Sequence, residues 1–303
     1  MTFKRYYSLE MVQSILDDIK AQFAHGNKIT QIILVNVFVF LVLVIVRAFS
    51  PPETGIYKFF LENLALSSDG WTLLRKPWTI LSHMFLHEGL WHMGWNMLML
   101  YWFGRIVGDL AGDRRILPLY LLGGLAGALF YSIYTQIAGI NGGLALGASG
   151  AVMAFVVAAG FLAPEYNMRL ILLGNVRLKY IAAALVAIDL IMLSENNNPG
   201  GRFAHIGGAV LGGFFVHMLR QGVDITRVFQ RGNDLFSGAS AARRVPMKVI
   251  HNKKRPKSRN RDTAPQQNTQ ERIDEILDKI NATGYESLTP EEKDFLYQAS
   301  KKS

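Results

Sequence analysis

One stretch of the chain reads Gly147-Ala-Ser-Gly-Ala-Val-Met-Ala-Phe-Val-Val-Ala-Ala-Gly-Phe-Leu-Ala163, a serine between small residues followed by an uninterrupted apolar run. A run without charged residues is suited to a bilayer or a deep core. Similar runs recur on both sides of it, so the sequence predicts an all-α membrane protein, a bundle of six transmembrane helices with a cytoplasmic C-terminal tail. The predicted spans are Ile29–Val46, Leu90–Val107, Leu117–Ile137, Ala148–Ala163, Tyr180–Leu193 and Phe203–Leu219.

The composition agrees with a membrane protein that has polar ends. Half of the 303 residues are hydrophobic, and they gather in blocks instead of spreading at the spacing of a soluble core. The chain has no cysteine, which excludes disulfides, thiol catalysis and thiolate metal sites. Residues 1–28 lack a short apolar stretch that ends in a small-residue cleavage site, so we expect a cytoplasmic N-terminal segment and no cleaved secretory signal.

Lysine and arginine are distributed unevenly among the predicted connections. Ten precede the first span, lie at the end of the second span (Arg105), or lie in the connections after the second and fourth spans, and seventeen follow from Arg220 onward. The opposite side receives five: Arg47, Lys58, Arg75, Lys76 and Arg202. Because positive residues favour the cytoplasmic side, both termini are predicted to be cytoplasmic, which agrees with an even number of spans.

Polar side chains stand near the predicted outer ends of three spans. His92 and Asn96 lie one helical turn apart in the second span, Ser149 begins the fourth, and His205 lies near the start of the sixth. With both termini inside, these three spans run in the same direction, so the four side chains are expected at one depth. Polar groups in a bilayer are costly unless they face the bundle interior, which marks this set as a candidate site.

The chemistry of this set suits nucleophilic catalysis. A serine hydroxyl becomes an effective nucleophile when a base takes its proton, and histidine is suited to that task near neutral pH. We therefore predict Ser149 as nucleophile and His205 as general base. His92, Asn96 and the Ser149 backbone N–H are the predicted donors to the oxyanion, and no carboxylate is evident to orient His205.

Glycines are expected to bring the reacting helices together. Gly147 and Gly150 flank the serine, and Gly208 and Gly212 form a GxxxG on the sixth span. Small residues at this spacing allow two helices to approach closely. We predict that the fourth and sixth helices pack tightly, which would bring Ser149 to His205.

These motifs together resemble the rhomboid family of intramembrane proteases, of the bacterial six-span type. The family's marks are His-x-x-x-Asn, Gly-x-Ser-Gly and Ala-His-x-x-Gly-x-x-x-Gly, which occur here in that order, beginning at His92, Gly147 and Ala204. The stretch Lys76-Pro-Trp-Thr-Ile-Leu-Ser-His-Met-Phe-Leu-His87 is similar to the family's lead-in to the second span. The resemblance covers roughly residues 29–220.

The resemblance implies an intramembrane serine endopeptidase with a Ser149–His205 dyad, no acid, no cofactor and no metal. It implies His92 and Asn96 at the oxyanion, a water-filled cavity open to the outer face, and single-span membrane proteins as substrates. It also implies a mobile gate formed by the fifth span and the loop before the sixth, Ser194–Gly201 here. The expected location is a bacterial inner membrane.

Two positions depart from the family pattern. Met153 stands where many relatives have a tyrosine that stacks on the catalytic histidine, and a thioether can still pack on the ring. Gly108 and Asp109 stand where many relatives have a glutamate after the second span. Asp189 in the fifth span has no evident partner in the sequence, and we expect it to make a polar contact with a neighbouring helix.

Other classes fit less well. His87-Glu-Gly-Leu-Trp-His92 is one residue too long for the HExxH motif of zinc proteases, and Ala151 replaces the second glycine of a hydrolase elbow. Transporters have charged residues along several spans or paired broken helices, which are not evident here. The remaining alternative is a catalytically inactive rhomboid-like protein that binds membrane clients without cleaving them.

The segments outside the spans carry separate predictions. Residues 56–66 are amphipathic and either lie in the membrane interface or form an exposed loop. Residues 221–267 are read as a flexible linker whose basic run, Lys253–Arg261, attracts anionic lipids and lacks the aromatics for nucleic acid. Residues 268–303 are predicted to hold two short helices, with Gly284 ending the first and a capping box at Thr289–Glu292. They form either a partner-binding hairpin or a solvated tail with transient helicity.

Overall fold

A computed structural model describes residues 13–14, 16–22, 26–50, 55–170, 174–193, 198–229 and 266–300. It divides into two compact units, residues 1–240 and 241–303, which are considered separately. Part of the predicted gate, residues 194–197, and the whole basic run of the linker lie outside the described residues.

A helix covers each of the six predicted apolar runs, and the ends differ from the predicted bounds by at most four residues. The helices are α2 (Lys28–Phe49), α6 (Leu90–Ala111), α7 (Ile116–Ile137), α8 (Ser149–Leu162), α9 (Leu178–Met192) and α10 (Pro199–Arg220). By length and composition, three of the described helical segments can cross a membrane: Lys28–Phe49, Asp113–Ile137 and Pro199–Arg220. That all six helices cross the membrane stays a prediction.

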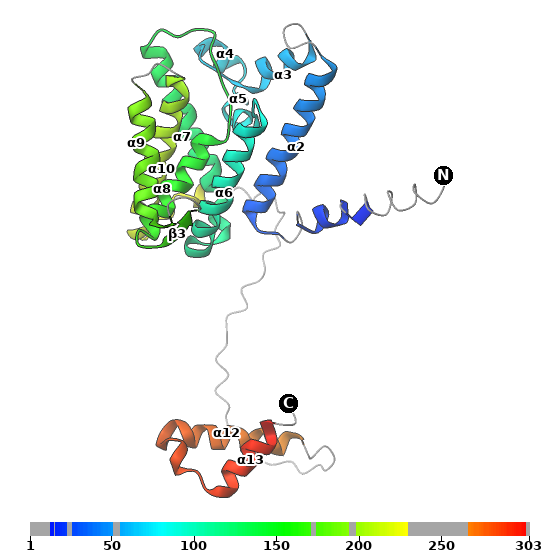
Figure 1. The fold of residues 1–303 in the computed structure, drawn as a ribbon, viewed down its shortest axis with the longest axis vertical. Coiled ribbons are helices and arrows are strands. Elements are labelled where there is room, and N and C mark those ends of the chain that lie inside the picture. The colour runs from blue at the N-terminus through cyan, green and yellow to red at the C-terminus, as the bar shows by residue number, and fades with distance from the viewer. Residues whose placement is uncertain are drawn as a thin grey trace, which may run out of the picture. The chain divides into compact units, whose positions relative to one another are not determined.

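Helix α8 lies at the centre of the bundle, in contact with α6, α7, α9 and α10 (Figure 1). Its residues Gly150–Gly160 are all buried, as expected for a helix that is apolar on every side. With 14 residues it is about 21 Å long at 1.5 Å per residue, which is less than the roughly 30 Å of a hydrocarbon core. Its N-terminus, which carries Ser149, is therefore suited to a position below a membrane surface.

Glycines set the distance between α7, α8 and α10. A Cβ added at Gly208 would lie 1.8 Å from the Gly150 carbonyl oxygen, and one at Gly212 would lie 2.3 Å from the Ala154 carbonyl oxygen. The predicted close packing of the fourth and sixth helices is thus confirmed. Gly123 and Gly127 of α7 extend the same seam, since a Cβ on Gly123 would lie 2.8 Å from Ala154 Cβ.

The connection between α2 and α6 is more ordered than the sequence predicts. It contains α3 (Ile56–Leu64), β1 (Leu66–Ser67), α4 (Gly70–Arg75), α5 (Thr79–Ser82) and η1 (His83–Phe85). Residues 56–64 form a helix, so the exposed-loop alternative for this amphipathic segment is wrong, while its position in the membrane interface stays a prediction. In Figure 1, α3 and α4 lie at the end of the bundle opposite β3 (Asn167–Leu170).

Two short antiparallel strand pairs qualify the all-α prediction. β1 pairs with β2 (Leu144–Ala145), with Leu66 opposite Ala145, and β3 pairs with β4 (Gly174–Arg177). Strands β1 and β2 have little signature in the sequence, since each has only two residues and depends on its partner. The β1–β2 pair ties the uncharged loop before Ser149 to the α3–α4 connection.

The second unit contains the two predicted helices, α12 (Gln266–Thr283) and α13 (Pro290–Ser300). The capping box is confirmed, because Thr289 N donates to Glu292 Oε2 (2.8 Å) and Glu292 N donates to Thr289 Oγ1 (3.3 Å). Ile276 and Leu288 are buried between the helices, and Lys279 Nζ lies 2.9 Å from Glu292 Oε1. These contacts favour a folded hairpin over a tail with transient helicity.

Candidate active site

The first two turns of α6, α8 and α10 carry the predicted site residues. His92 lies in the first turn of α6, Ser149 is the first residue of α8, and His205 lies in the second turn of α10. The loop before α8 is held in place because Gly147 N donates to the His83 carbonyl oxygen (2.9 Å). This bond joins the α8 entrance to the segment that precedes α6.

Ser149 and His92 converge on Gly147. A Cβ added at Gly147 would lie 2.8 Å from His92 Nε2 and 3.7 Å from Ser149 Oγ, so both atoms lie within 4 Å of the same point. Gly147 has a φ of +129°, a conformation that side chains other than glycine rarely adopt. The glycine therefore permits both the turn and the approach of the two side chains.

His205 reaches the same region through the α8–α10 contact. The Ala204 carbonyl oxygen lies 3.3 Å from the Cβ position of Gly150, so the residues next to His205 and Ser149 are in contact. His205 is half-buried, with 26% of its side chain exposed. Among the hydrogen bonds of the described residues there is none between Ser149 Oγ and His205. Such bonds are often long before substrate binds.

A carboxylate does face His205, which corrects the expectation that none orients it. Asp189 on α9 lies with its Oδ2 3.0 Å and its Oδ1 3.1 Å from His205 Nδ1. Arg202 Nη1 donates to Asp189 Oδ1 (3.0 Å). The expected polar contact of Asp189 with a neighbouring helix is thus confirmed, and it involves the predicted base itself. Asp189 and His205 lie on different helices joined by a loop, so the sequence does not show that they meet. The one hint was an acidic residue within an apolar run.

Asn96 is buried on the predicted face of α6, but its amide is partly engaged. Asn96 Nδ2 donates to the His92 carbonyl oxygen (2.8 Å) within the same helix. An amide has two N–H groups, so one donor remains beyond this bond. The structure therefore places Asn96 next to His92, and its role at an oxyanion stays a prediction.

The two departures from the family pattern have distinct surroundings. Met153 is buried and packs with Val157 and Ala209. Ala209 lies one helical turn after His205 on α10. Gly108 lies within α6 against Ile116, while Asp109 is exposed. Neither position reproduces the family's side chain.

A buried ion pair ties the start of α7 to the segment after α10. Arg115 Nε lies 2.8 Å from Asp224 Oδ2, with 15% and 3% of the two side chains exposed. Burial by itself raises the pKa of the Asp224 carboxyl, but hydrogen bonds from Thr226 together with the Arg115 charge outweigh it, so the pKa lies below its ordinary value. This pair has no signature in the sequence, because residues 109 positions apart show no pattern that couples them.

Two histidines beside the site were also missed as site neighbours. His83 is buried and its Nδ1 lies 3.0 Å from the Thr79 carbonyl oxygen, while His87 Nε2 lies 3.5 Å from Ala148 N. The rings of His87 and His92 meet edge to face with centroids 5.1 Å apart. Burial lowers the pKa of both His83 and His87 to about 4, so they are neutral near pH 7. Both histidines lie in the stretch Lys76–His87, and its similarity to the family was the sequence feature that could have pointed to them.

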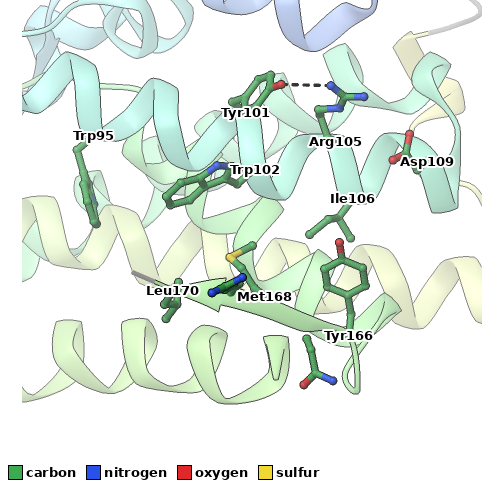
Figure 2. A pocket seen from close by; sticks show the side chains of 11 residues that line it. Trp95, Tyr101, Trp102, Arg105, Ile106, Asp109, Tyr166, Met168 and Leu170 are labelled. Carbon is green, nitrogen blue, oxygen red and sulfur yellow. Dashed lines mark hydrogen bonds between the residues drawn. The ribbon is translucent and has the colours of Figure 1, made fainter. Parts of the chain in front are cut away.

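A small cavity adjoins Ser149. It has a volume of about 30 Å³ and is lined by Tyr131, Gly147, Gly150 and Ala204, among others. This volume suits a single water molecule. A larger cavity of about 980 Å³ lies elsewhere, between α6 and β3, and contains none of the predicted site residues (Figure 2).

Comparison with known proteins supplies independent information. Residues 74–222 match the model of the rhomboid domain, and residues 263–302 match a family of unknown function, DUF6576. The first match contains all four predicted site residues and Asp189. The second contains the whole of α12 and α13 together with the turn between them.

Several curated proteins are similar to the chain. It is 30% identical over 178 residues to RHOMBOID-like protein 12, mitochondrial, of Arabidopsis thaliana, covering 54% of this chain and 53% of that protein. It is 31% identical over 195 residues to the Presenilin-associated rhomboid-like protein, mitochondrial, of Homo sapiens, covering 62% and 47%. It is 25% identical over 218 residues to the Rhomboid protease GluP of Bacillus subtilis, covering 71% and 39%.

The chain spans about half the length of the first curated relatives that it matches. Some relatives are named as mitochondrial and one is a bacterial protease, so the kind of membrane is not distinguished. The apolar helices and the family match agree on a multi-pass membrane protein. Residues 74–222 match the rhomboid domain and the chain is similar to rhomboid proteins over this region, so this part of the chain is a domain of the rhomboid family.

Proposed function

We propose that the protein is an intramembrane serine endopeptidase that cleaves transmembrane segments of single-span membrane proteins within a six-span bundle. The observation that carries the proposal is the convergence of Ser149 Oγ and His92 Nε2 within 4 Å of the Gly147 Cβ position, next to the contact of Ala204 with Gly150. The homology to rhomboid proteases supports the same reaction.

In the acylation step, Ser149 Oγ attacks the scissile carbonyl carbon while His205 accepts the hydroxyl proton. The carbonyl oxygen becomes an oxyanion, for which His92, the second Asn96 N–H and the Ser149 backbone N–H are the proposed donors. The Ser149 N–H lies at the N-terminus of α8, where the helix dipole also favours negative charge.

Collapse of the tetrahedral intermediate breaks the C–N bond, and His205 donates its proton to the departing amine. A water molecule then attacks the Ser149 ester while His205 accepts a proton from it. The acyl group leaves as a carboxylic acid, and the proton returns to Ser149 Oγ. Recessing the reaction below the surface suits the short α8, but it requires water to reach Ser149.

A fluorophosphonate probe and a model single-span substrate test the proposal. Detergent-solubilised wild-type protein should be labelled and should cleave the substrate, while S149A loses both and H205A is slowed by roughly 10²- to 10⁴-fold. S132A on α7 and H217A at the far end of α10 are matched controls that retain activity. Labelling and cleavage that persist in S149A and H205A would sink the mechanism.

The non-cleaving alternative has one observation in its favour, the lack of a Ser149–His205 hydrogen bond among the described residues. It predicts that the wild type retains the single-span client in a pull-down, is not labelled by the probe, and leaves the client intact. Labelling of the wild type that S149A abolishes excludes this alternative.

A further inference from the structure

The carboxylate of Asp189 joins two helices at the predicted base. Its oxygens lie 3.0 Å and 3.1 Å from His205 Nδ1, and only 10% of the side chain is exposed. Arg202, one turn before His205 on α10, lies 3.0 Å from the same carboxylate with 16% of its side chain exposed. Asp189 thus accepts from two groups of α10 while belonging to α9.

This contact determines which nitrogen of His205 carries the proton. An ionised carboxylate can only accept hydrogen bonds, so Nδ1 must be the protonated nitrogen. Neutral imidazole then has its lone pair on Nε2, the nitrogen that a serine hydroxyl needs for proton transfer. When the ring gains a second proton, the adjacent carboxylate stabilises the resulting cation.

We infer that Asp189 is a positioning residue that holds His205 in the tautomer and orientation required of a general base, an inference that rests on the proposed function. Arg202 balances the charge of the carboxylate, which a buried acid in an apolar helix requires. The carboxylate that orients His205 is therefore supplied by α9, while Ser149 and His205 remain the proposed catalytic pair.

Variants of Arg202 distinguish the positioning of His205 by Asp189 from a general contribution of the Asp189–Arg202 ion pair to stability. D189N and D189A should lower kcat by roughly 10²-fold or more with little change in KM, because substrate contacts remain. R202Q removes the other partner of the carboxylate and should lower kcat much less. I188A, at an exposed neighbouring position of α9, should behave as the wild type.

A spectroscopic measurement reports the tautomer directly. In protein labelled with ¹⁵N-histidine, the signal that H205A removes should show Nδ1 protonation in the wild type and increased Nε2 protonation in D189N. The double variant D189N/R202Q restores charge balance, and it should remain as inactive as D189N.

The outcomes divide clearly. Wild-type kcat and an unchanged His205 tautomer in D189N would overturn the inference, as would recovery of activity in D189N/R202Q, which would assign the defect to charge imbalance. Failure of the proposed function would appear differently, as cleavage that S149A does not reduce. The tautomer measurement stands in either case because it requires no turnover.

A second inference concerns the cavity of about 980 Å³ between α6 and β3. Figure 2 shows Trp95 and Leu170 toward one end of it and Arg105 with Asp109 toward the other. Trp102, Ile106 and Met168 supply an apolar wall between these ends. Tyr101 and Tyr166 also line it, and Tyr101 accepts a hydrogen bond from Arg105 Nη1 (3.2 Å).

Arg105 and Asp109 lie at one end of this groove, and Arg169 of β3 also lines it. Arg105 and Arg169 are exposed, and within the described part of the chain Arg169 has no salt bridge. Arg105 lies toward the end of α6 and Arg169 in the connection after α8, both on the side that the uneven lysine and arginine distribution predicts to be cytoplasmic. Tryptophan and tyrosine beside arginine are typical of the headgroup level of a bilayer.

We propose that this groove binds one anionic phospholipid of the cytoplasmic leaflet. Its acyl chain lies along Trp95, Trp102 and Met168, its phosphate is held by Arg105, and Arg169 adds positive charge to the groove. The two arginines outweigh the single carboxylate of Asp109, which gives a preference for an anionic over a zwitterionic lipid. A basic pocket with an apolar floor at the inner interface has the chemistry of such a site.

Native mass spectrometry of the detergent-purified full chain tests the site. With phosphatidylglycerol, the wild type should retain one lipid about tenfold more tightly than phosphatidylcholine, and R105Q/R169Q should lose this preference. R114Q/R177Q removes two arginines outside the groove and should keep it. Equal retention of the two lipids by the wild type, or an unchanged preference in R105Q/R169Q, would overturn the proposal.

Discussion

At position 147, both the backbone conformation and the neighbouring side chain of His92 require a glycine. The positive φ disfavours any side chain, and a methyl group would meet His92 Nε2 at 2.8 Å. Such a position combines backbone strain of about 1–3 kcal/mol with displacement of a candidate site residue. The glycine thus belongs to the site although it has no functional group.

We predict that G147A reduces fluorophosphonate labelling at least tenfold and lowers stability by about 1–3 kcal/mol. The measurement compares labelling rate with thermal unfolding in the same detergent. G94A is the control, because nothing lies within 4 Å of its Cβ position and its φ is not positive. Labelling of G147A at the wild-type rate would contradict the proposed need for glycine at this turn.

Asp224 permits a prediction about pH. Its pKa is below the ordinary value in the folded protein, so its pair with Arg115 stabilises the fold above the ordinary aspartate pKa and stops doing so as pH falls through the lowered pKa. D224N should therefore lower stability by about 3 kcal/mol at pH 7, since it leaves Arg115 without its buried partner.

The difference in unfolding between wild type and D224N should shrink as the pH falls through the lowered pKa of Asp224, because the wild-type carboxyl then becomes protonated. Thermal unfolding followed across the acidic range measures it. D109N, at an exposed carboxyl, serves as the reference variant. A D224N defect that stays constant across this range would show that charge is not its cause.

At the scale of elements, the seam between α8 and α10 governs the distance between nucleophile and base. Backbone meets backbone where Gly208 faces Gly150, and again where Gly212 faces Ala154. In a bilayer, helix association depends strongly on such close van der Waals packing. Small shifts along the seam would separate Ser149 from His205.

G208A should destabilise the bundle by at least 1–3 kcal/mol, roughly the cost of overpacking, and should abolish probe labelling. G213A on the same helix is the matched control, because its added Cβ would lie 3.8 Å from Val157 Cγ1, an ordinary contact. Thermal unfolding and labelling of the two variants decide the matter. Equal behaviour of G208A and G213A would refute the role of the seam.

At the scale of the whole molecule, the chain consists of two units with separate cores. The core of the second unit includes Ile276, which is 4% exposed, next to Leu277, which is 47% exposed. Each unit should therefore unfold without requiring the other to do so.

I276D in the full chain should unfold the α12–α13 hairpin, whereas L277D should leave it folded, because only the first change buries a charge. Limited proteolysis of the tail reports the hairpin, and probe labelling reports the bundle. We expect labelling to be unchanged in both variants. Loss of labelling in I276D alone would show that the second unit supports the first.

The sequence by itself determined the features that depend on local composition and spacing. Apolar runs located all six helices, because burial or insertion of such runs is driven by their own composition. Spacing placed His92 and Asn96 on one face, and the Thr289 capping box was readable because its partners are three residues apart. The family motifs are local in the same sense.

Only the tertiary structure decided which distant side chains meet. Asp189 faces His205 because α9 and α10 pack side by side, and Arg115 reaches Asp224 across 109 positions. Two-residue strands form only when a partner is present, so β1 and β2 were not predictable. Contacts between helices depend on relative rotation and depth, which the packing of all the helices fixes together and no single segment encodes.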